Sequence, residues 1–540
     1  MLSKEEKKIL RSDLFRHLDG IVTAPTAYCL HKHGILDELL NKEKCSVNEL
    51  ASEYKANEGN LNVALRVLCS QGWLDASLDN ESNEVSYAIN EKSKCAFAHV
   101  HLYEDAVHLI QLSGKFHPRK FEKEPFEAMA SIFDKYLKDY GIEWSESNLE
   151  KDVQGQILKH IEGVLVGPTA VALGMGGMFH NYFMKASFKA EEFHQDPESF
   201  GRLLNYFSQI GWFEKSNGKT FAFSEKGLFF AKRASAYGVT VSYLPNFRKL
   251  DELIFGNAKV LWNVPEGSAE IHVDREMNVW GSGGAHSTYF KKIDEIVMSI
   301  FNRPIHEQPK GIVDMGCGNG AFLEHLFNVI DQRTLRGEML DEHPLFLVGA
   351  DFNQAALKVT RANLIKADIW AKVIWGDIGR PDKLAEDLEK DYNISLNDLL
   401  NVRTFLDHNR MWEEPTNDFQ DRSASSSGAF SYRGKRLSNK AVEQSLKEHL
   451  QKWSPFVQRF GLLLIELHTI PSSITANNLG RTAATAYDAT HGFSDQYILE
   501  VDVFNRIAAE AGLFPDENYF TKFPNSELAT VSINLLKGRD

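Results

Sequence analysis

The pattern of apolar and polar positions changes its period near residue 310. Before it, apolar residues recur at helical spacing, as in Leu61, Ala64, Leu65 and Leu68. After it, short apolar runs alternate with helical stretches. These runs lie at 311–316, 345–351, 371–377, 398–406 and 460–468. Strand, helix and strand repeated in this order predict an α/β domain with a doubly wound parallel sheet.

The N-terminal half contains an internal repeat. The matching pairs are 19–27 (DGIVTAPTA) with 162–170 (EGVLVGPTA), 65–74 with 204–213, and 86–92 with 220–226. In the first copy, Ser46 and Glu49 form a capping box that opens a helix. A strand is predicted to begin at Gly72-Trp73-Leu74, with residues 85–89 as its partner. Helices followed by a small hairpin predict two winged-helix-like α+β domains ahead of the sheet.

These patterns divide the chain into five predicted parts. They are a first winged-helix-like copy at 1–99, a helical bridge at 100–156, a second copy at 157–235, a linker with a helical cover at 236–309, and a core at 310–540. The glycines of 279–286 (VWGSGGAH) indicate a hinge or a backbone close to a ligand. The Ser-, Gly- and Arg-rich stretch 421–436 predicts a loop, either a surface insertion or a mobile lid. Runs at 514–524 and 529–538 predict antiparallel strands that close the sheet.

Composition narrows the function classes. The net charge of −14 has the wrong sign for a protein whose main partner is a polyanion, and the predicted recognition helix at 59–70 offers only Arg66. DNA binding is therefore disfavoured, and a helical module that packs an interface or covers a cleft suits the copies better. Five scattered cysteines without a CxxC pair indicate a reducing compartment. The charged N-terminus resembles no secretory signal, so we expect a soluble cytoplasmic protein with no membrane contact.

The first strand of the core runs into a glycine turn, GIVDMGCGNGAF. Taken alone, this string also satisfies the dinucleotide fingerprint, so an NAD enzyme stays a rival. An acidic residue before the first glycine, Asp314, would repel a pyrophosphate but suits the ammonium of a methionine tail. Asp351 closes the second strand and suits ribose hydroxyls, whereas Asp377 and Ile378 after the third strand suit an adenine amine and ring.

On these motifs, residues 310–540 resemble a class I S-adenosylmethionine-dependent methyltransferase with its Rossmann-like sheet, and the duplicated half resembles segments that precede the core in small-molecule methyltransferases. The resemblance implies cofactor-binding roles for Asp314, Gly316, Gly318, Asp351, Phe352, Asp377, Ile378 and Arg403.

Two strings at the predicted strand ends carry candidate chemistry. RTFLDHNR (403–410) places Asp407 and His408 after the fourth strand, and TAYDATHGFSDQY (485–497) follows the fifth. Two histidines plus a carboxylate are a set used by mononuclear iron and are also suited to manganese. Spacing alone leaves open whether they form a metal site or a polar wall without metal.

The strings VWGSGGAH, DMGCGNG, RTFLDHNR, SGAFSYRG and YDATHGFSDQY together resemble the metal-dependent C-methyltransferase domains of polyketide synthase loading modules, of the apratoxin and saxitoxin types. That resemblance implies methylation of malonyl on an acyl carrier protein, assisted by a divalent metal, iron or manganese. The metal ligands favoured are Asp407, His408, His491 and Gln496, and the catalytic residues favoured are His408, Tyr487 and His491.

The sequence leaves several points open. Arg422, Arg433 or Lys435 in the predicted loop is a candidate to meet the phosphopantetheine phosphate or the malonyl carboxylate. The alternatives are a metal-free O-methyltransferase with a histidine base, and a winged-helix regulator that senses S-adenosylmethionine. The oligomeric state is left open.

Overall fold

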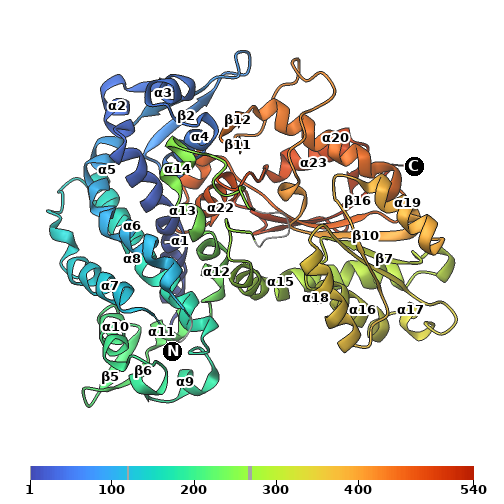
Figure 1. The fold of residues 1–540 in the computed structure, drawn as a ribbon, viewed down its shortest axis with the longest axis horizontal. Coiled ribbons are helices and arrows are strands. Elements are labelled where there is room, and N and C mark those ends of the chain that lie inside the picture. The colour runs from blue at the N-terminus through green and yellow to red at the C-terminus, as the bar shows by residue number, and fades with distance from the viewer. Residues whose placement is uncertain (1, 118–120, 265–269, 540) are drawn as a thin grey trace. The chain divides into compact units, whose positions relative to one another are not determined.

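The chain, described by a computed structural model over residues 2–117, 121–264 and 270–539, folds into two compact units (Figure 1). Unit 1 comprises Met1–Ala285, Ala429–Arg436 and Pro471–Ser494. Unit 2 comprises His286–Gly428, Leu437–Ile470 and Asp495–Asp540. The division differs from the predicted boundary at 310, because two later segments of the chain pack in unit 1.

Unit 1 contains both copies of the repeat. The first copy holds α1 (Lys4–Lys32), α2 (Ile35–Lys42), β1 (Lys44–Ser46), α3 (Val47–Tyr54), α4 (Glu58–Ser70), β2 (Leu74–Leu78), β3 (Val85–Ile89) and α5 (Ser93–His99). The second holds α8 (Asn148–Met175), α9 (Asn181–Lys185), β4 (Phe188–Lys189), α10 (Pro197–Gln209), β5 (Phe213–Ser216), β6 (Thr220–Phe223) and α11 (Glu225–Ala231). The two small sheets have equivalent strand orders, β1-β3-β2 and β4-β6-β5. This equivalence confirms the predicted duplicated winged-helix-like domains.

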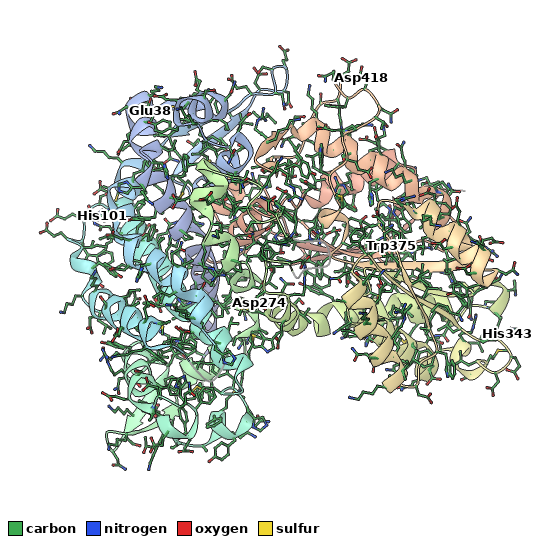
Figure 2. All side chains as sticks on the ribbon, in the orientation of Figure 1. Glu38, His101, Asp274, His343, Trp375 and Asp418 are labelled. Carbon is green, nitrogen blue, oxygen red and sulfur yellow. The ribbon has the colours of Figure 1, made fainter. Side chains whose placement is uncertain are left out.

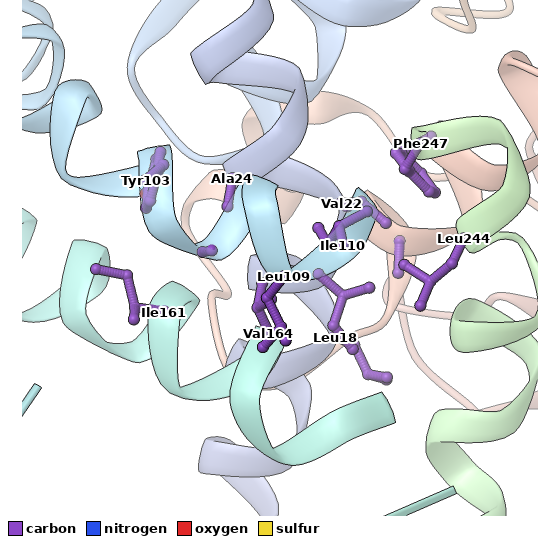
Figure 3. Packing of buried hydrophobic residues seen from close by; sticks show 14 of the residues in the cluster. Leu18, Val22, Ala24, Tyr103, Leu109, Ile110, Ile161, Val164, Leu244 and Phe247 are labelled. Carbon is purple, nitrogen blue, oxygen red and sulfur yellow. The ribbon is translucent and has the colours of Figure 1, made fainter. Parts of the chain in front are cut away.

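Further helices complete unit 1. They are η1 (Val100–Tyr103), α6 (Glu104–Gln111), α7 (Lys123–Tyr136), α12 (Ser235–Ser242), α13 (Leu244–Phe247), α14 (Leu250–Phe255), α21 (Ser472–Ala476) and α22 (Ala484–Gly492). Side chains from several of these helices and from α1 and α8 meet in one core, which includes Leu18, Leu109, Val164 and Phe247 (Figure 3).

The two copies pack against each other reciprocally through α1 and α8. A Cβ added to Gly20 would lie 2.3 Å from His160 Cα, and one added to Gly163 would lie 2.6 Å from His17 Cα. Each of these two histidines also forms a hydrogen bond with a tyrosine. His17 Nδ1 lies 2.8 Å from the Tyr237 hydroxyl, and His160 Nδ1 lies 2.6 Å from the Tyr103 hydroxyl. Equivalent residues that swap partners are the mark of a two-fold interface, here formed inside one chain.

Alanine at Gly163 is expected to destabilise unit 1 by about 2 to 3 kcal/mol, because its methyl group would overlap the backbone of His17. Gly155 lies on the same helix, and a Cβ there would meet no atom within 4 Å. Alanine at Gly155 is therefore the matched control and should stabilise by up to about 1 kcal/mol, the usual difference in helix propensity. Denaturant unfolding of both variants checks the opposite signs, and equal signs would contradict the close α1–α8 packing.

Two helices, α8 and α15, bear on the predictions. α8 is the one described helix long and apolar enough to cross a membrane, but 89% of its apolar window is buried inside the protein, as expected of a core helix. α15 (Arg275–Phe301) contains the glycines of 279–286, so that stretch is helical, and the hinge stays a prediction. Gly281 instead allows close packing on α12, since its Cβ would lie 2.6 Å from Gly238 C. The side chains of 284–288 lie outside the described residues.

Unit 2 is built on an 8-stranded sheet in the order β14-β16-β13-β10-β7-β8-β9, with β15 paired to β16. Its strands are β7 (Gly311–Met315), β8 (Phe346–Asp351), β9 (Lys372–Trp375), β10 (Leu399–Thr404), β13 (Leu462–Leu467), β14 (Phe514–Pro515), β15 (Thr521–Phe523) and β16 (Val531–Lys537). Strands β7, β8, β9, β10 and β13 are parallel to one another, and β16 is antiparallel to β13. The predicted doubly wound sheet with antiparallel closing strands is confirmed.

Helices cover both faces of this sheet (Figure 1). They are α16 (Ala321–Arg333), α17 (Leu335–Glu338), α18 (Gln354–Lys366), α19 (Pro381–Tyr392), η7 (Asp407–Asn409), α20 (Asn439–Val457) and α23 (Val501–Glu510). The strand order reverses between β7 and β10, and such a switch point opens a crevice at the carboxyl ends of the strands. Residues directly after β7, β8, β9 and β10 are therefore placed to meet a ligand.

The predicted loop at 421–436 has two parts. Residues 423–429 form neither helix nor strand, whereas β11 (Phe430–Tyr432) and β12 (Lys435–Leu437) pair as a hairpin. The hairpin turn uses positive φ angles at Arg433 (53°) and Gly434 (86°). The second half of this stretch therefore differs from the expected loop, because β11 and β12 pair with each other as two short strands.

Candidate active site

A glycine turn follows the central strand β7. Gly316 and Gly318 have φ angles of 80° and 56°, which glycine adopts without strain. A Cβ at Gly316 would lie 2.9 Å from Leu406 Cδ2, whereas a Cβ at Gly318 would meet no atom within 4 Å. The turn therefore leaves open space at Gly318, where a ligand can approach the backbone.

Asp351 links the end of β8 to this turn. Its Oδ2 accepts a hydrogen bond from Gly318 N (3.0 Å) and its Oδ1 accepts one from Asn353 N (2.8 Å). These bonds fix the carboxylate while each oxygen keeps further acceptor capacity. The adjacent Phe352 is 57% exposed, and its ring centroid lies 5.7 Å from that of Trp375 on β9. Trp375 is labelled in Figure 2.

Asp377 and Ile378 follow β9. Asp377 Oδ1 accepts a hydrogen bond from Gly379 N (2.8 Å), which holds the carboxylate in place. Ile378 is buried, and its carbonyl accepts a hydrogen bond from Trp453 Nε1 (2.7 Å). A fixed carboxylate beside an apolar side chain fits the predicted contacts to an aminated aromatic ring.

Asp314, at the end of β7, is buried and has an unsatisfied oxygen. Burial raises the pKa of its carboxyl group to about 7, and the nearby charge of Asp351 adds to the effect. Its Oδ1 has no hydrogen-bond partner among the described residues. A buried carboxyl group with a spare acceptor is suited to a cationic ligand, which would restore its charge.

His408 is oriented by a carboxylate that the sequence reasoning missed. Glu466, on β13, bonds His408 Nδ1 through Oε1 and accepts a hydrogen bond from Asp407 N through Oε2 (3.0 Å). Because a carboxylate accepts and does not donate, Nδ1 carries a proton and Nε2 is the basic ring nitrogen. The signal that would have found Glu466 is its position at the end of the fifth apolar run.

Asp407 belongs to a buried network. Its Oδ1 accepts hydrogen bonds from Arg403 Nη1 (2.5 Å) and His449 Nε2 (3.1 Å). Burial opposes its ionisation, but the Arg403 charge and the His449 hydrogen bond hold the pKa of Asp407 well below its usual value. Its Oδ2 has no hydrogen-bond partner among the described residues. Arg403 also lies 4.0 Å from the Trp453 ring centroid, and its Nε and Nη2 are buried without described partners.

Tyr487 and His491 lie on α22 in unit 1. His491 Nδ1 is 2.9 Å from the Tyr487 carbonyl oxygen, and its ring centroid lies 5.6 Å from that of Tyr243. Burial raises the pKa of the Tyr487 hydroxyl group, which favours its neutral form. A buried ion pair, Arg66 Nε to Asp488 Oδ2 (2.9 Å), holds α22 to α4. The single basic residue of the predicted recognition helix is thus used inside unit 1.

The structure groups the predicted site residues by unit. Unit 2 brings together Arg403, Asp407 and His408, and it also contains Gln496, which is buried. Tyr497, next to Gln496, donates its backbone N–H to the His408 carbonyl (2.8 Å). His491 and Tyr487 belong to unit 1.

The basic residues of 421–436 differ in their surroundings. Arg422 pairs with Glu443 (3.1 Å) and Glu510 (2.7 Å) and is therefore committed to internal ion pairs. Arg433 lies 3.7 Å from the ring centroid of Trp262, and Lys435 is exposed. Of the three candidates, Arg422 is the least suited to meet a substrate anion.

Three family models match the chain in order. They are the AprA N-terminal domain at 10–76, the AprA winged helix domain at 162–257 and the AprA MT2-like domain at 270–534. Among curated proteins, none matches the chain.

Solved structures with a similar arrangement include three methyltransferases. The mitomycin 7-O-methyltransferase MmcR shares 11% identity over 72% of this chain and 99% of its own, with a TM-score of 0.42. A putative O-methyltransferase from Nostoc punctiforme PCC 73102 shares 12% identity over 68% of this chain and 94% of its own, with a TM-score of 0.39. The dimethyltransferase RosA from Streptomyces davawensis shares 12% identity over 71% of this chain and 99% of its own, with a TM-score of 0.36.

Proposed function

We propose that this chain, which belongs to the S-adenosylmethionine-dependent methyltransferases and carries an AprA MT2-like domain, methylates the α-carbon of a malonyl-type acyl group on an acyl carrier protein in polyketide biosynthesis. The observation that carries the proposal is the ordered match of three AprA domain models, which together span most of the chain. The His408–Glu466 pair supports it, because removal of an α-proton needs an oriented base near the methyl donor.

In the proposed reaction, Asp351, Asp377 and Ile378 bind the nucleoside of S-adenosylmethionine, and Asp314 meets its cationic methionine end. His408 accepts the α-proton of the acyl group at Nε2, while Glu466 stabilises the imidazolium that forms. The resulting carbanion forms a bond to the methyl carbon as the carbon–sulfur bond breaks. S-adenosylhomocysteine, methylated acyl group and protonated His408 are the products of this step.

A divalent metal, iron or manganese, is part of the proposal. A metal-binding histidine usually donates its other ring N–H to a carboxylate, as His408 does to Glu466. The ionised Asp407 also has an unpaired buried oxygen among the described residues. These residues fit a cation, which when bound would stabilise the enolate. In unit 2, Asp407 and Gln496 would hold it, whereas Nε2 of His408 cannot bind the ion and accept the α-proton at once, so the two predicted roles of His408 are alternatives. His491 in unit 1 stays a predicted ligand.

The direct test is intact-mass analysis of malonyl carrier protein incubated with the full chain and S-adenosylmethionine. We expect a gain of one or two methyl masses, and loss of that gain after chelation with recovery on adding iron(II) or manganese(II). Methyl transfer that survives chelation would overturn the metal role. Methylation of a free phenol with no change in the carrier would favour the metal-free O-methyltransferase.

The pH dependence of cofactor affinity should report Asp314. Since burial raises its pKa to about 7, the carboxyl group is mostly neutral below that pH and mostly charged above it. A cationic ligand needs the charged form, so S-adenosylmethionine should bind about tenfold more weakly at pH 6 than at pH 8. Calorimetric titration measures this, and Asp314→Asn should flatten the profile. An unchanged slope in that variant would exclude Asp314 as the titrating group.

The acyl carrier protein partner is supported by a surface of unit 2. On α18 and the loop after it, Lys358, Ile365, Lys366 and Trp370 are exposed, Ile365 by 76% and Trp370 by 89%. We name this set the α18 patch. Within a chain of net charge −14, an exposed basic and apolar helix face complements an acidic protein.

We also propose a cytoplasmic location, supported by five free cysteines.

Charge reversal at Lys358 and Lys366 combined with Trp370→Ala is expected to raise KM for the carrier-bound substrate about tenfold or more, because it removes attraction and apolar contact together. KM for malonyl-pantetheine, which lacks the carrier, should stay the same. Lys390→Glu on α19, another exposed lysine of unit 2, is the matched control and should change neither value. Equal effects on both substrates would contradict docking at the α18 patch.

A further inference from the structure

A mixed set of metal-binding side chains lies at the end of α1, in unit 1. Cys29 and His33 are four residues apart, so they lie on one face of the helix end, and Asp251 comes from α14. The Cys29 thiol lies 3.6 Å from Asp251 Oδ1, and His33 Nε2 lies 2.9 Å from the same oxygen. One ligand atom from each of the three residues lies within 4.8 Å of the other two.

These distances are close to those of a tetrahedral zinc site. Zinc bonds of about 2.3 Å to sulfur and about 2.0 to 2.2 Å to nitrogen and oxygen place neighbouring donors roughly 3.3 to 3.6 Å apart. The sulfur–oxygen distance already has this value, and the nitrogen–oxygen distance needs a small opening. A donor set of thiolate, imidazole and carboxylate favours zinc over the harder magnesium and calcium ions.

The surroundings hold Cys29 and His33 in place and leave His33 and Asp251 accessible to solvent. Cys29 is buried, and the His33 ring stacks on Phe255 with centroids 3.7 Å apart. The His33 and Asp251 side chains are 34% and 57% exposed, so an ion and a water ligand can reach them. Lys32 Nζ lies 3.4 Å from Asp251 Oδ2 and opposes a cation, but its side chain is 58% exposed and free to turn into water.

We propose that Cys29, His33 and Asp251 bind one zinc ion, with water as the fourth ligand, and that the ion ties α1 to α14. The site is separate from the metal proposed for methyl transfer, whose ligands include no thiolate.

The test uses the full chain, stripped of metal and titrated with cobalt(II). We expect one equivalent to give tetrahedral visible bands and a near-ultraviolet thiolate-to-cobalt band, and zinc to abolish both. Cys29→Ser should remove the thiolate band, and His33→Asn should weaken cobalt binding at least tenfold.

Two controls make the result specific. Cys95→Ser changes the one free cysteine that is not fully buried and should keep the band. His408→Ala alters the proposed methyl-transfer metal site and should keep it as well. Zinc should also raise the Tm of the wild type but not of Cys29→Ser, which must itself melt cooperatively. No thiolate band, or a band that persists in Cys29→Ser, would overturn the zinc site whatever becomes of the proposed methyl transfer.

Discussion

Replacing His408 with alanine is expected to lower kcat for methyl transfer by about two to four orders of magnitude, the usual contribution of a general base. The reason is the geometry of its ring. Glu466 holds Nδ1, so a single ring nitrogen, Nε2, can take the proton of the acyl group. The affinity for S-adenosylmethionine should hardly change, because His408 lies on η7 after β10 and the predicted nucleoside contacts lie at the ends of β8 and β9.

Glu466→Gln separates orientation from the base itself. Glutamine keeps the size of the side chain but cannot stabilise an imidazolium by charge, so kcat should fall less than in His408→Ala.

The matched control is His468, two residues beyond Glu466. It is buried and bonds the Leu499 carbonyl and Ser532, which are structural partners. His468→Asn should leave kcat within a few-fold, provided that its Tm shows a folded protein. Single-turnover rates with malonyl carrier protein measure all three variants. A His408→Ala enzyme with nearly normal turnover would exclude His408 as the base.

Much of the fold was predictable because local patterns decide it. The strand at Leu74–Leu78 and its partner at Val85–Ile89 follow from turn residues and alternation. The five parallel strands are apolar runs that a buried sheet requires on both faces. The turn after β7 needs a positive φ angle at positions 316 and 318, and the sequence has glycine at both. In such places, sequence neighbours alone determine the structure.

What could not be predicted depends on contacts between distant parts of the chain. The segment with Asp488 follows the fifth strand, yet it packs in unit 1 through an ion pair with Arg66, 422 positions away. No periodicity reports such a pair. The role of Glu466 was missed for the same reason, since its partner His408 lies 58 positions earlier. Glycines at 281 and 283 look flexible in sequence but are helical in the fold.

Asp351→Asn is expected to weaken S-adenosylmethionine binding by about two orders of magnitude. A charged acceptor that bonds two ribose hydroxyls contributes about 1.5 to 3 kcal/mol per bond, and 1.4 kcal/mol corresponds to a factor of ten. Asparagine loses the charge and offers one acceptor in place of two oxygens, yet it keeps the size of the side chain. It is therefore a gentler change than alanine for the hydrogen bonds that Gly318 N and Asn353 N now donate.

The ribose contact can be distinguished from a general disturbance of the glycine turn with a second ligand. An analogue of S-adenosylhomocysteine without the 2′- and 3′-hydroxyls should bind the wild type and Asp351→Asn with the same affinity, because the bonds in question are absent from both complexes. If the variant loses affinity for the analogue as well, Asp351 acts by holding Gly318 in place and the ribose assignment is wrong. Asp368→Asn, an exposed carboxyl group beyond α18, is the matched control and should bind both ligands like the wild type.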